Sequence, residues 1–184
     1  RRYYCSSLTY KLSALANDFP FYSILMKSKI KDFVHKNNID RMHIHDIQIA
    51  KAAVDVCKKY NLKYTLDLHE NRHEIMKSYK HVNSFLGKLL ISVKRWKKAE
   101  EEYVSKAEKV IVVTNQAKKE IIKRCKISND NVVVYPNTVR KSFYQNKDYD
   151  HELKKKYANN YVLLYIGNTS ERRGLDTVLD SMIS

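Results

Sequence analysis

The stretch DRMHIHDIQIAKAAVDVCKKYNLKYTLDLHEN, residues 40–71, decides the fold. Residues 41–46 and 62–68 are short apolar runs with the alternation that is typical of β-strands. Residues 47–60 between them predict a helix, whose apolar face would carry Ile49, Ala53, Val56 and Tyr60. A strand, a helix and a second strand in this order indicate two parallel strands joined by a crossover helix.

The same alternation continues outward from this stretch. The pattern predicts further strands over 109–114, 131–136 and 161–167, and helices over 24–37, 115–125, 150–158 and onward from Gly174. Thr114 or Asn115 is the expected cap of the helix at 115–125. The strands are apolar and rich in β-branched residues, so we predict an α/β fold, a Rossmann-like parallel sheet with helices on both faces.

Pro136 interrupts this pattern and marks a predicted domain boundary. We expect residues 1–136 to form one domain and residues 137–184 to be the start of a second Rossmann-like domain. The whole chain of 184 residues is long enough for one ordinary domain and little more.

Composition indicates a packed protein in a reducing environment. The chain is 43% hydrophobic, yet no apolar run reaches the roughly 18 residues of a membrane-spanning helix. The first residues, RRYYCSSLTYKLSA, lack the apolar segment of a secretory signal. Cys5, Cys57 and Cys125 are odd in number and widely spaced. We therefore expect free thiols and a cytoplasmic location.

The charge is strongly positive, with 35 Lys and Arg against 20 acidic residues. Such a surface attracts polyanions, although a general bias of the sequence toward Lys, Asn and Tyr explains it equally well. The sequence contains no aromatic RNA-binding segment, GXXG loop or zinc finger. No specific nucleic-acid partner is therefore expected.

Residues 69–73 spell H-E-x-x-H, the pattern that grips zinc when both histidines lie on one helix. Here His69 directly follows the predicted strand 62–68, so the two histidines should not share a helix. A metal-dependent hydrolase that uses His45, His69 and His73 is therefore our third-ranked hypothesis, and no metal site is predicted.

Residues 43–46, HIHD, place His43 and His45 on the same face of a strand, as the H-x-H pair of some metal hydrolases does. We interpret His43 as structural. His45 and Asp46 stand at the carboxyl end of the strand, the edge at which open α/β sheets bind ligands. The D-x-D at 148–150 resembles a metal-binding motif of some glycosyltransferases, but its polar surroundings favour solvated charge.

Several motifs in order resemble the retaining GT-B glycosyltransferases of family 4. They are a strand ending HIHD, a strand ending DLHE, a long helix, AEKVIVVT, VVVYPN, and then YIG followed by Arg173-Gly174. The resemblance covers about residues 40–184. It implies sugar transfer from a nucleotide-sugar donor, without a metal or other cofactor, to a glycan or lipid-linked acceptor, as in surface polysaccharide biosynthesis.

The resemblance also implies roles for individual residues. His69 would be catalytic, facing the donor sugar and stabilising the positive charge that develops on it. The residues expected to line the cleft are His45, Asp46, Glu70 and Asn137. Those expected to bind the donor diphosphate are Gly167, Asn168, Arg173 and Gly174, with Asn168 standing where the family usually carries a basic residue. A Rossmann-like nucleotide or phosphosugar binder without transfer activity is the alternative.

Two features of the family do not occur in this sequence, namely its N-terminal glycine-rich loop and its E-x₇-E segment. Gly87 is the first glycine of the chain. We therefore expect the 184 residues to be a fragment that does not transfer sugar by itself.

The predicted helix 82–106 is basic and amphipathic and contains Trp96. Its apolar face would pack on the sheet or lie on an anionic membrane surface. The second possibility would make the protein peripheral at the inner face of the membrane.

Overall fold

The structure is a computed structural model that describes residues 6–145 and 150–182. Its contacts divide the chain into two units, Arg1–Asn137 and Thr138–Ser184. The first unit holds the sheet and the core, and each unit is described by itself.

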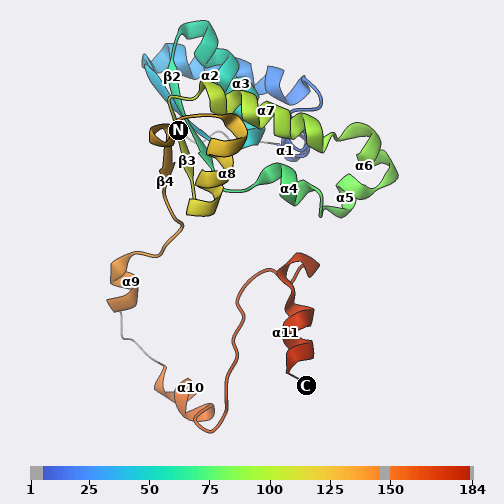
Figure 1. The fold of residues 1–184 in the computed structure, drawn as a ribbon, viewed down its shortest axis with the longest axis vertical. Coiled ribbons are helices and arrows are strands. Elements are labelled where there is room, and N and C mark those ends of the chain that lie inside the picture. The colour runs from blue at the N-terminus through green and yellow to red at the C-terminus, as the bar shows by residue number, and fades with distance from the viewer. Residues whose placement is uncertain (1–5, 146–149, 183–184) are drawn as a thin grey trace. The chain divides into compact units, whose positions relative to one another are not determined.

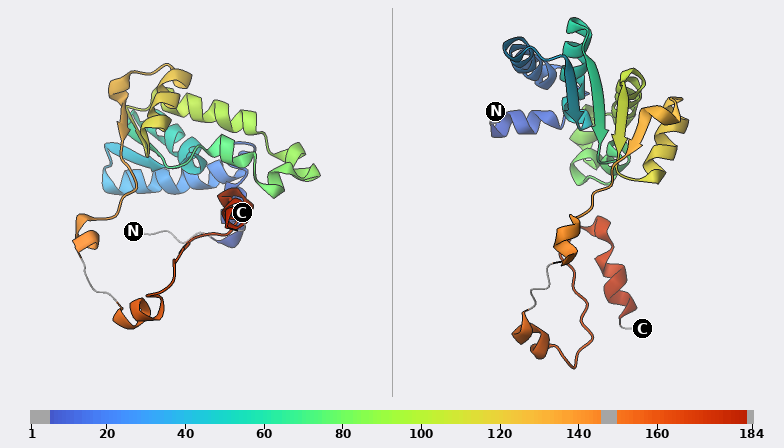
Figure 2. Two further views of the ribbon diagram at one scale, coloured as in Figure 1. Left: turned by 60° about the horizontal axis from the view of Figure 1, so that its bottom comes forward. Right: turned by 90° about the vertical axis from the view of Figure 1, so that its left-hand side faces the viewer.

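Four parallel strands form the sheet of the first unit. They are β1 (Arg41–His45), β2 (Lys63–Leu68), β3 (Lys109–Val112) and β4 (Val132–Val134). The strands follow one another across the sheet in chain order (Figure 2). His45 lies opposite Asp67, and Leu68 lies opposite Val112. The predicted α/β fold with a parallel sheet flanked by helices is confirmed.

The large helices form one layer against this sheet. They are α2 (Phe21–Asn37), α3 (Ile47–Tyr60), α7 (Val93–Lys106) and α8 (Asn115–Cys125). Helix α3 packs on β1 and β2, α8 packs on β3 and β4, and α7 contacts both helices (Figure 1). Crossovers are right-handed in nearly all proteins, so strands in sequential order place their crossover helices on the same face.

The burial of the strands agrees with this arrangement. Ile44, Leu66, Val110 and Val112 are at most 2% exposed and face the helices. The alternate residues Arg41, His43, Lys63 and Lys109 are exposed. Among the described residues, one face of the sheet is thus covered by helices and the other is largely open to solvent. The prediction had placed helices on both faces.

The prediction of one continuous helix over residues 82–106 is wrong. The structure has α5 (Lys80–Asn83), α6 (Phe85–Leu90) and α7 in its place. The hydroxyls of Ser84 and Ser92 accept from the backbone N–H groups of Gly87 and Arg95, at 3.1 and 3.3 Å, and so begin α6 and α7. A Cβ at Gly87 would lie 1.9 Å from a carbonyl of α5, which explains the glycine there.

The second break is fixed by a tertiary contact. Helix α1 (Ser7–Ser13) leads into a loop whose Asp18 accepts from the backbone N–H of Ser92 at 2.9 Å and from Nε1 of Trp96 at 2.7 Å. Trp96 is 1% exposed and belongs to the core. The apolar face predicted for one long helix is therefore divided between a buried part on α7 and an exposed part on α6.

The second unit contains three short helices. They are α9 (Lys141–Gln145), α10 (His151–Lys156) and α11 (Leu175–Ser181), with a 3₁₀ turn at Glu171–Arg173. The predicted strand at 161–167 is absent. Those residues are exposed and carry no strand pairing within the described part of the chain, because a strand forms only where a neighbour accepts its backbone hydrogen bonds. Asp148 and Tyr149 of the D-x-D lie outside the described residues.

Candidate functional site

The carboxyl ends of β1 and β2 bring predicted site residues together. His45 ends β1 opposite Asp67. His69 directly follows β2, and its ring centroid lies 4.6 Å from that of His45. The predicted position of His69, at the tip of a parallel strand beside His45, is confirmed.

Asp67 is the centre of this group and is only 8% exposed. Its Oδ2 lies 3.1 Å from Nε2 of His43 and 3.3 Å from Nδ1 of His45. Its Oδ1 lies 3.1 Å from Nε2 of His69. Burial alone would raise the pKa of this carboxyl, but the three imidazoles outweigh burial and hold the pKa below its ordinary value. Asp67 is therefore a carboxylate that orients the histidines around it.

His69 has a second partner on its other ring nitrogen. The side-chain amide of Asn137 lies 3.4 Å from Nδ1. An amide N–H donates to an unprotonated Nδ1, which leaves the ring proton on Nε2, facing Asp67. Asp67 and Asn137 thus hold the imidazole of His69 from both sides, and 28% of the side chain is exposed to solvent.

Asp46 begins α3 with a backbone that only glycine adopts readily, φ 67° and ψ 156°. Its N–H donates to the carbonyl of Asp67 at 2.9 Å. Its Oδ2 lies 3.8 Å from Nε2 of His45. The remaining predicted cleft residue, Glu70, accepts a hydrogen bond from Arg72 at 3.1 Å and lines a pocket beside His69.

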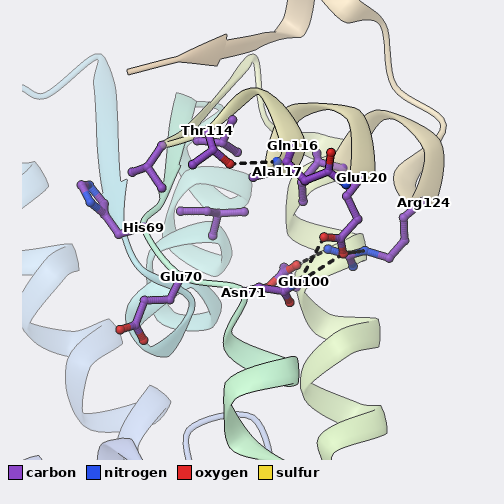
Figure 3. Close-up of a pocket in the computed structure, with 13 residues that line it drawn as sticks. His69, Glu70, Asn71, Glu100, Thr114, Gln116, Ala117, Glu120 and Arg124 are labelled. Atoms are coloured by element: carbon purple, nitrogen blue, oxygen red, sulfur yellow. Dashed lines mark hydrogen bonds and ion pairs between the residues drawn. The ribbon is translucent and has the colours of Figure 1, made fainter. Parts of the chain in front are cut away.

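A pocket of about 260 Å³ opens beside His69, between the end of β2 and the start of α8 (Figure 3). At the first turn of α8 the hydroxyl of Thr114 accepts from the N–H of Ala117 at 3.0 Å, as predicted for a cap. Across the pocket, Asn71 donates to Glu120 at 3.0 Å. One wall is thus the N-terminal turn of an 11-residue helix, where backbone N–H groups favour oxygen-rich ligands.

A buried ion pair that the sequence did not reveal closes the far end of this pocket. Glu100 on α7 pairs with Arg124 on α8, and their side chains are 3% and 12% exposed. Arg124 also pairs with Glu101 at 3.2 Å. Only the position of Glu100 on the apolar side of a helical pattern could have indicated its burial.

His73 faces this ion pair and not His69. It is 3% exposed, and its Nδ1 lies 3.8 Å from Oε1 of Glu100. Helix α4 (Arg72–Met76) begins after His69, so the H-E-x-x-H pattern does not place two histidines on one helix. Among the described residues, the group that could hold a metal ion is His43, His45 and Asp67. The set His45, His69 and His73, proposed for a hydrolase, is therefore wrong.

The predicted donor-binding residues lie in the second unit. Gly174, at φ 64°, joins the 3₁₀ turn that ends at Arg173 to helix α11. The carbonyl of Asn168 accepts from the hydroxyl of Tyr165 at 2.7 Å. Arg173 is exposed. The predicted helix start at Gly174 is confirmed, and the binding roles of Gly167, Asn168, Arg173 and Gly174 stay predictions.

No helix among the described residues has both the length and the apolar character that crossing a bilayer requires. A search of curated proteins gave no match. The family profile of Glycosyltransferase Family 4 matches residues 9–143, which include all four strands and the residues around His69 but not Arg173. The match covers well over half of the chain, and the chain therefore belongs to glycosyltransferase family 4.

Proposed function

We propose that this chain is the acceptor-side domain and the start of the donor-side domain of a retaining glycosyltransferase that moves a sugar from a nucleotide-sugar donor to a glycan or lipid-linked acceptor. The observation that carries the proposal is the imidazole of His69, held between Asp67 and Asn137 at the edge of a pocket, in a chain of this family. A glycan or lipid-linked acceptor fits the synthesis of a cell-surface glycan by a protein on the cytoplasmic side of the membrane.

The chemistry follows from the orientation of His69. Loss of the nucleotide diphosphate leaves positive charge on the sugar ring. A C=O group held rigidly with its oxygen toward that ring stabilises the positive charge of the transition state more than the ground state, because it does not have to reorganise. Asp67 and Asn137 fix the position and the tilt of the imidazole. His45 and Asp46 lie close enough to contact the same ligand.

The leaving diphosphate would be neutralised by protein groups alone. In this proposal Arg173 supplies a fixed guanidinium, and the backbone around Gly167, Asn168 and Gly174 approaches the phosphates. No metal ion is needed on the diphosphate.

Helix α6 is the proposed contact with a membrane-bound acceptor. Phe85, Leu86 and Leu89 are 87%, 65% and 74% exposed. Lys88 on the same helix and Lys80 on α5 are also exposed. Exposed apolar side chains among lysines suit the interface of an anionic bilayer.

The decisive experiment compares wild type with His69→Ala and His69→Gln. Donor hydrolysis and transfer to lipid-linked acceptors are measured with UDP- and GDP-sugars, for the 184 residues and for the product of the whole reading frame. The 184 residues are not expected to transfer sugar by themselves, so the effect is read from the product of the whole reading frame, whose kcat should fall by about 10²–10³ on removal of a group aimed at the transition state. His81→Ala, an exposed histidine on α5, is the matched control. Nucleotide-sugar binding without turnover would favour the binding-module alternative.

Membrane contact is tested separately by co-sedimentation with vesicles. Wild type should bind vesicles that contain anionic lipid more strongly than neutral ones. Phe85→Ser with Leu89→Ser should abolish the difference, whereas Leu153→Ser, an exposed leucine on α10, should not. Equal sedimentation of wild type and the double variant would contradict the α6 contact.

A further inference from the structure

His43, His45 and Asp67 point three ligand atoms at one spot on the open face of the sheet. One ring nitrogen of His43, one ring nitrogen of His45 and a carboxylate oxygen of Asp67 all lie within 4.8 Å of one another. His43 and His45 are two residues apart on β1, so their side chains leave the same face of the sheet. Asp67 is the register partner of His45 on β2.

The spacing fits a common metal ion. In a tetrahedral site with bonds of about 2.0–2.1 Å, neighbouring ligand atoms lie about 3.3 Å apart. Oδ2 of Asp67 lies 3.1 Å from the nitrogen of His43 and 3.3 Å from that of His45. The two histidine nitrogens lie within 4.8 Å of each other, so an ion can sit among the three atoms once the exposed imidazoles rotate to bring these nitrogens closer together.

The surroundings of these three residues also suit a metal site. Oδ1 of Asp67 is buried and faces Nε2 of His69 at 3.1 Å. The second ring nitrogen of His45 lies 3.8 Å from a carboxylate oxygen of Asp46. Outer partners of this kind, a carboxylate behind a histidine and a histidine behind a carboxylate, orient ligands around bound metals.

We propose that His43, His45 and Asp67 bind one divalent transition-metal ion of the Zn²⁺ class. Two imidazoles and one carboxylate suit Zn²⁺, Co²⁺ or Ni²⁺, whereas Mg²⁺ and Ca²⁺ prefer sites made of oxygen atoms. The side chains of His43 and His45 are 54% and 59% exposed, so an ion can reach the site from solvent and keep water in its open positions.

This inference is independent of the proposed sugar transfer. The ligand atoms lie on the sheet face, and the ion is not assigned to the donor diphosphate. Binding would tie Oδ2 of Asp67 to the metal and leave Oδ1 for His69. The bound ion would thus restrict the motion of the Asp67 carboxylate that orients His69.

The test measures metal binding by the untagged chain without any activity assay. After loading with Zn²⁺ and dialysis, elemental analysis should find one ion per chain, and Zn²⁺ should raise Tm. Co²⁺ should bind at the same site with a visible absorption band that Zn²⁺ displaces. His43→Ala and the isosteric Asp67→Asn should each lower affinity by more than the roughly 10–100-fold that is typical for loss of an outer partner.

His69→Ala should weaken binding by about tenfold, as an outer partner would, and should leave the Co²⁺ spectrum unchanged. The controls are His81→Ala and His151→Ala, exposed histidines elsewhere, which should bind as wild type does. Absence of retained Zn²⁺ in wild type, or equal affinity of wild type and Asp67→Asn, would overturn the proposal. Because transfer is assayed separately, either result leaves the proposed function to its own test.

Discussion

Asp46 combines an exposed side chain with a backbone that is unfavourable for any residue with a Cβ. At φ 67° and ψ 156°, this conformation costs roughly 1–3 kcal/mol. A strained residue between a strand and a helix, next to His45, is the pattern of a functional position.

We expect Asp46→Gly to stabilise the fold. Relief of strain exceeds the extra chain entropy that glycine loses on folding, so the free energy of unfolding should rise by about 1 kcal/mol. Urea denaturation followed by circular dichroism measures it. Asp46→Ala is the matched control, since it removes the same carboxylate and keeps the Cβ. If Asp46→Ala gains as much as Asp46→Gly, the backbone is not the cause.

Glu100 and Arg124 form a buried ion pair whose contribution to the free energy of unfolding depends on both partners being present. Arg124→Met leaves the carboxylate of Glu100 buried beside His73 and should lower the free energy of unfolding by about 3–5 kcal/mol. The double variant Glu100→Gln with Arg124→Met should recover a large part of that loss, because it removes the buried charge. A double variant that is less stable than Arg124→Met alone would show that the unpaired charge of Glu100 is not the cause of the loss. Thermal and urea unfolding of the wild type and of both variants decide between these outcomes.

The residues of the site were predictable to different degrees. His45 and His69 were identified because each ends a strand, and the ends of parallel strands meet at one edge. Asp67 lies inside the predicted strand 62–68 and was not assigned a role, since its convergence with His43 depends on the register between two strands. Glu100 and Arg124 are 24 residues apart in sequence, and no local pattern relates them.

At the scale of elements, apolar periodicity was sufficient to predict a helix that lies between two strands. It was not sufficient to predict where a helical stretch is interrupted. The boundaries of α3 and α8 agree with the predicted ranges 47–60 and 115–125, because each helix lies between two strands and has a clear apolar face. Residues 82–106 also have an apolar face, but Ser84 and Ser92 divide it. Serine caps compete with a continuous helix, and the contact with Asp18 that fixes the second break comes from a distant loop.

The break before α7 predicts a measurable effect of its cap. Ser92→Ala removes the oxygen that accepts from the N–H of Arg95 and should lower the free energy of unfolding by about 1 kcal/mol. Ser105→Ala is the control, since Ser105 lies inside the same helix and bonds only to the carbonyl of Glu102. This control should be neutral or slightly stabilising, as alanine is the better helix former. Equal losses in both variants would indicate that Ser92 does not act as a cap.

At the scale of the whole molecule, the core lies entirely in the first unit. Among the described residues, Val132 is the last in the chain that is buried. The boundary between the units falls after Asn137, which keeps the partner of His69 in the first unit. The sequence placed a domain boundary at Pro136, but the strand that it assigned to 161–167 depends on pairing that no local pattern supplies.

We therefore expect residues 1–137 to fold without the rest of the chain. Removal of 138–184 takes away no buried side chain of the described core, so Tm should change by less than about 3 °C, the shift that ~1 kcal/mol causes in a chain of this size. Limited proteolysis of the intact chain should give a resistant fragment that ends after β4, since the segment beyond Asn137 is exposed. A second truncation, after residue 130, is the control. It removes β4 and the buried Val132, so it should unfold at a clearly lower temperature. If residues 1–137 lose cooperative unfolding as well, the second unit contributes to the core, and the division into two units is wrong.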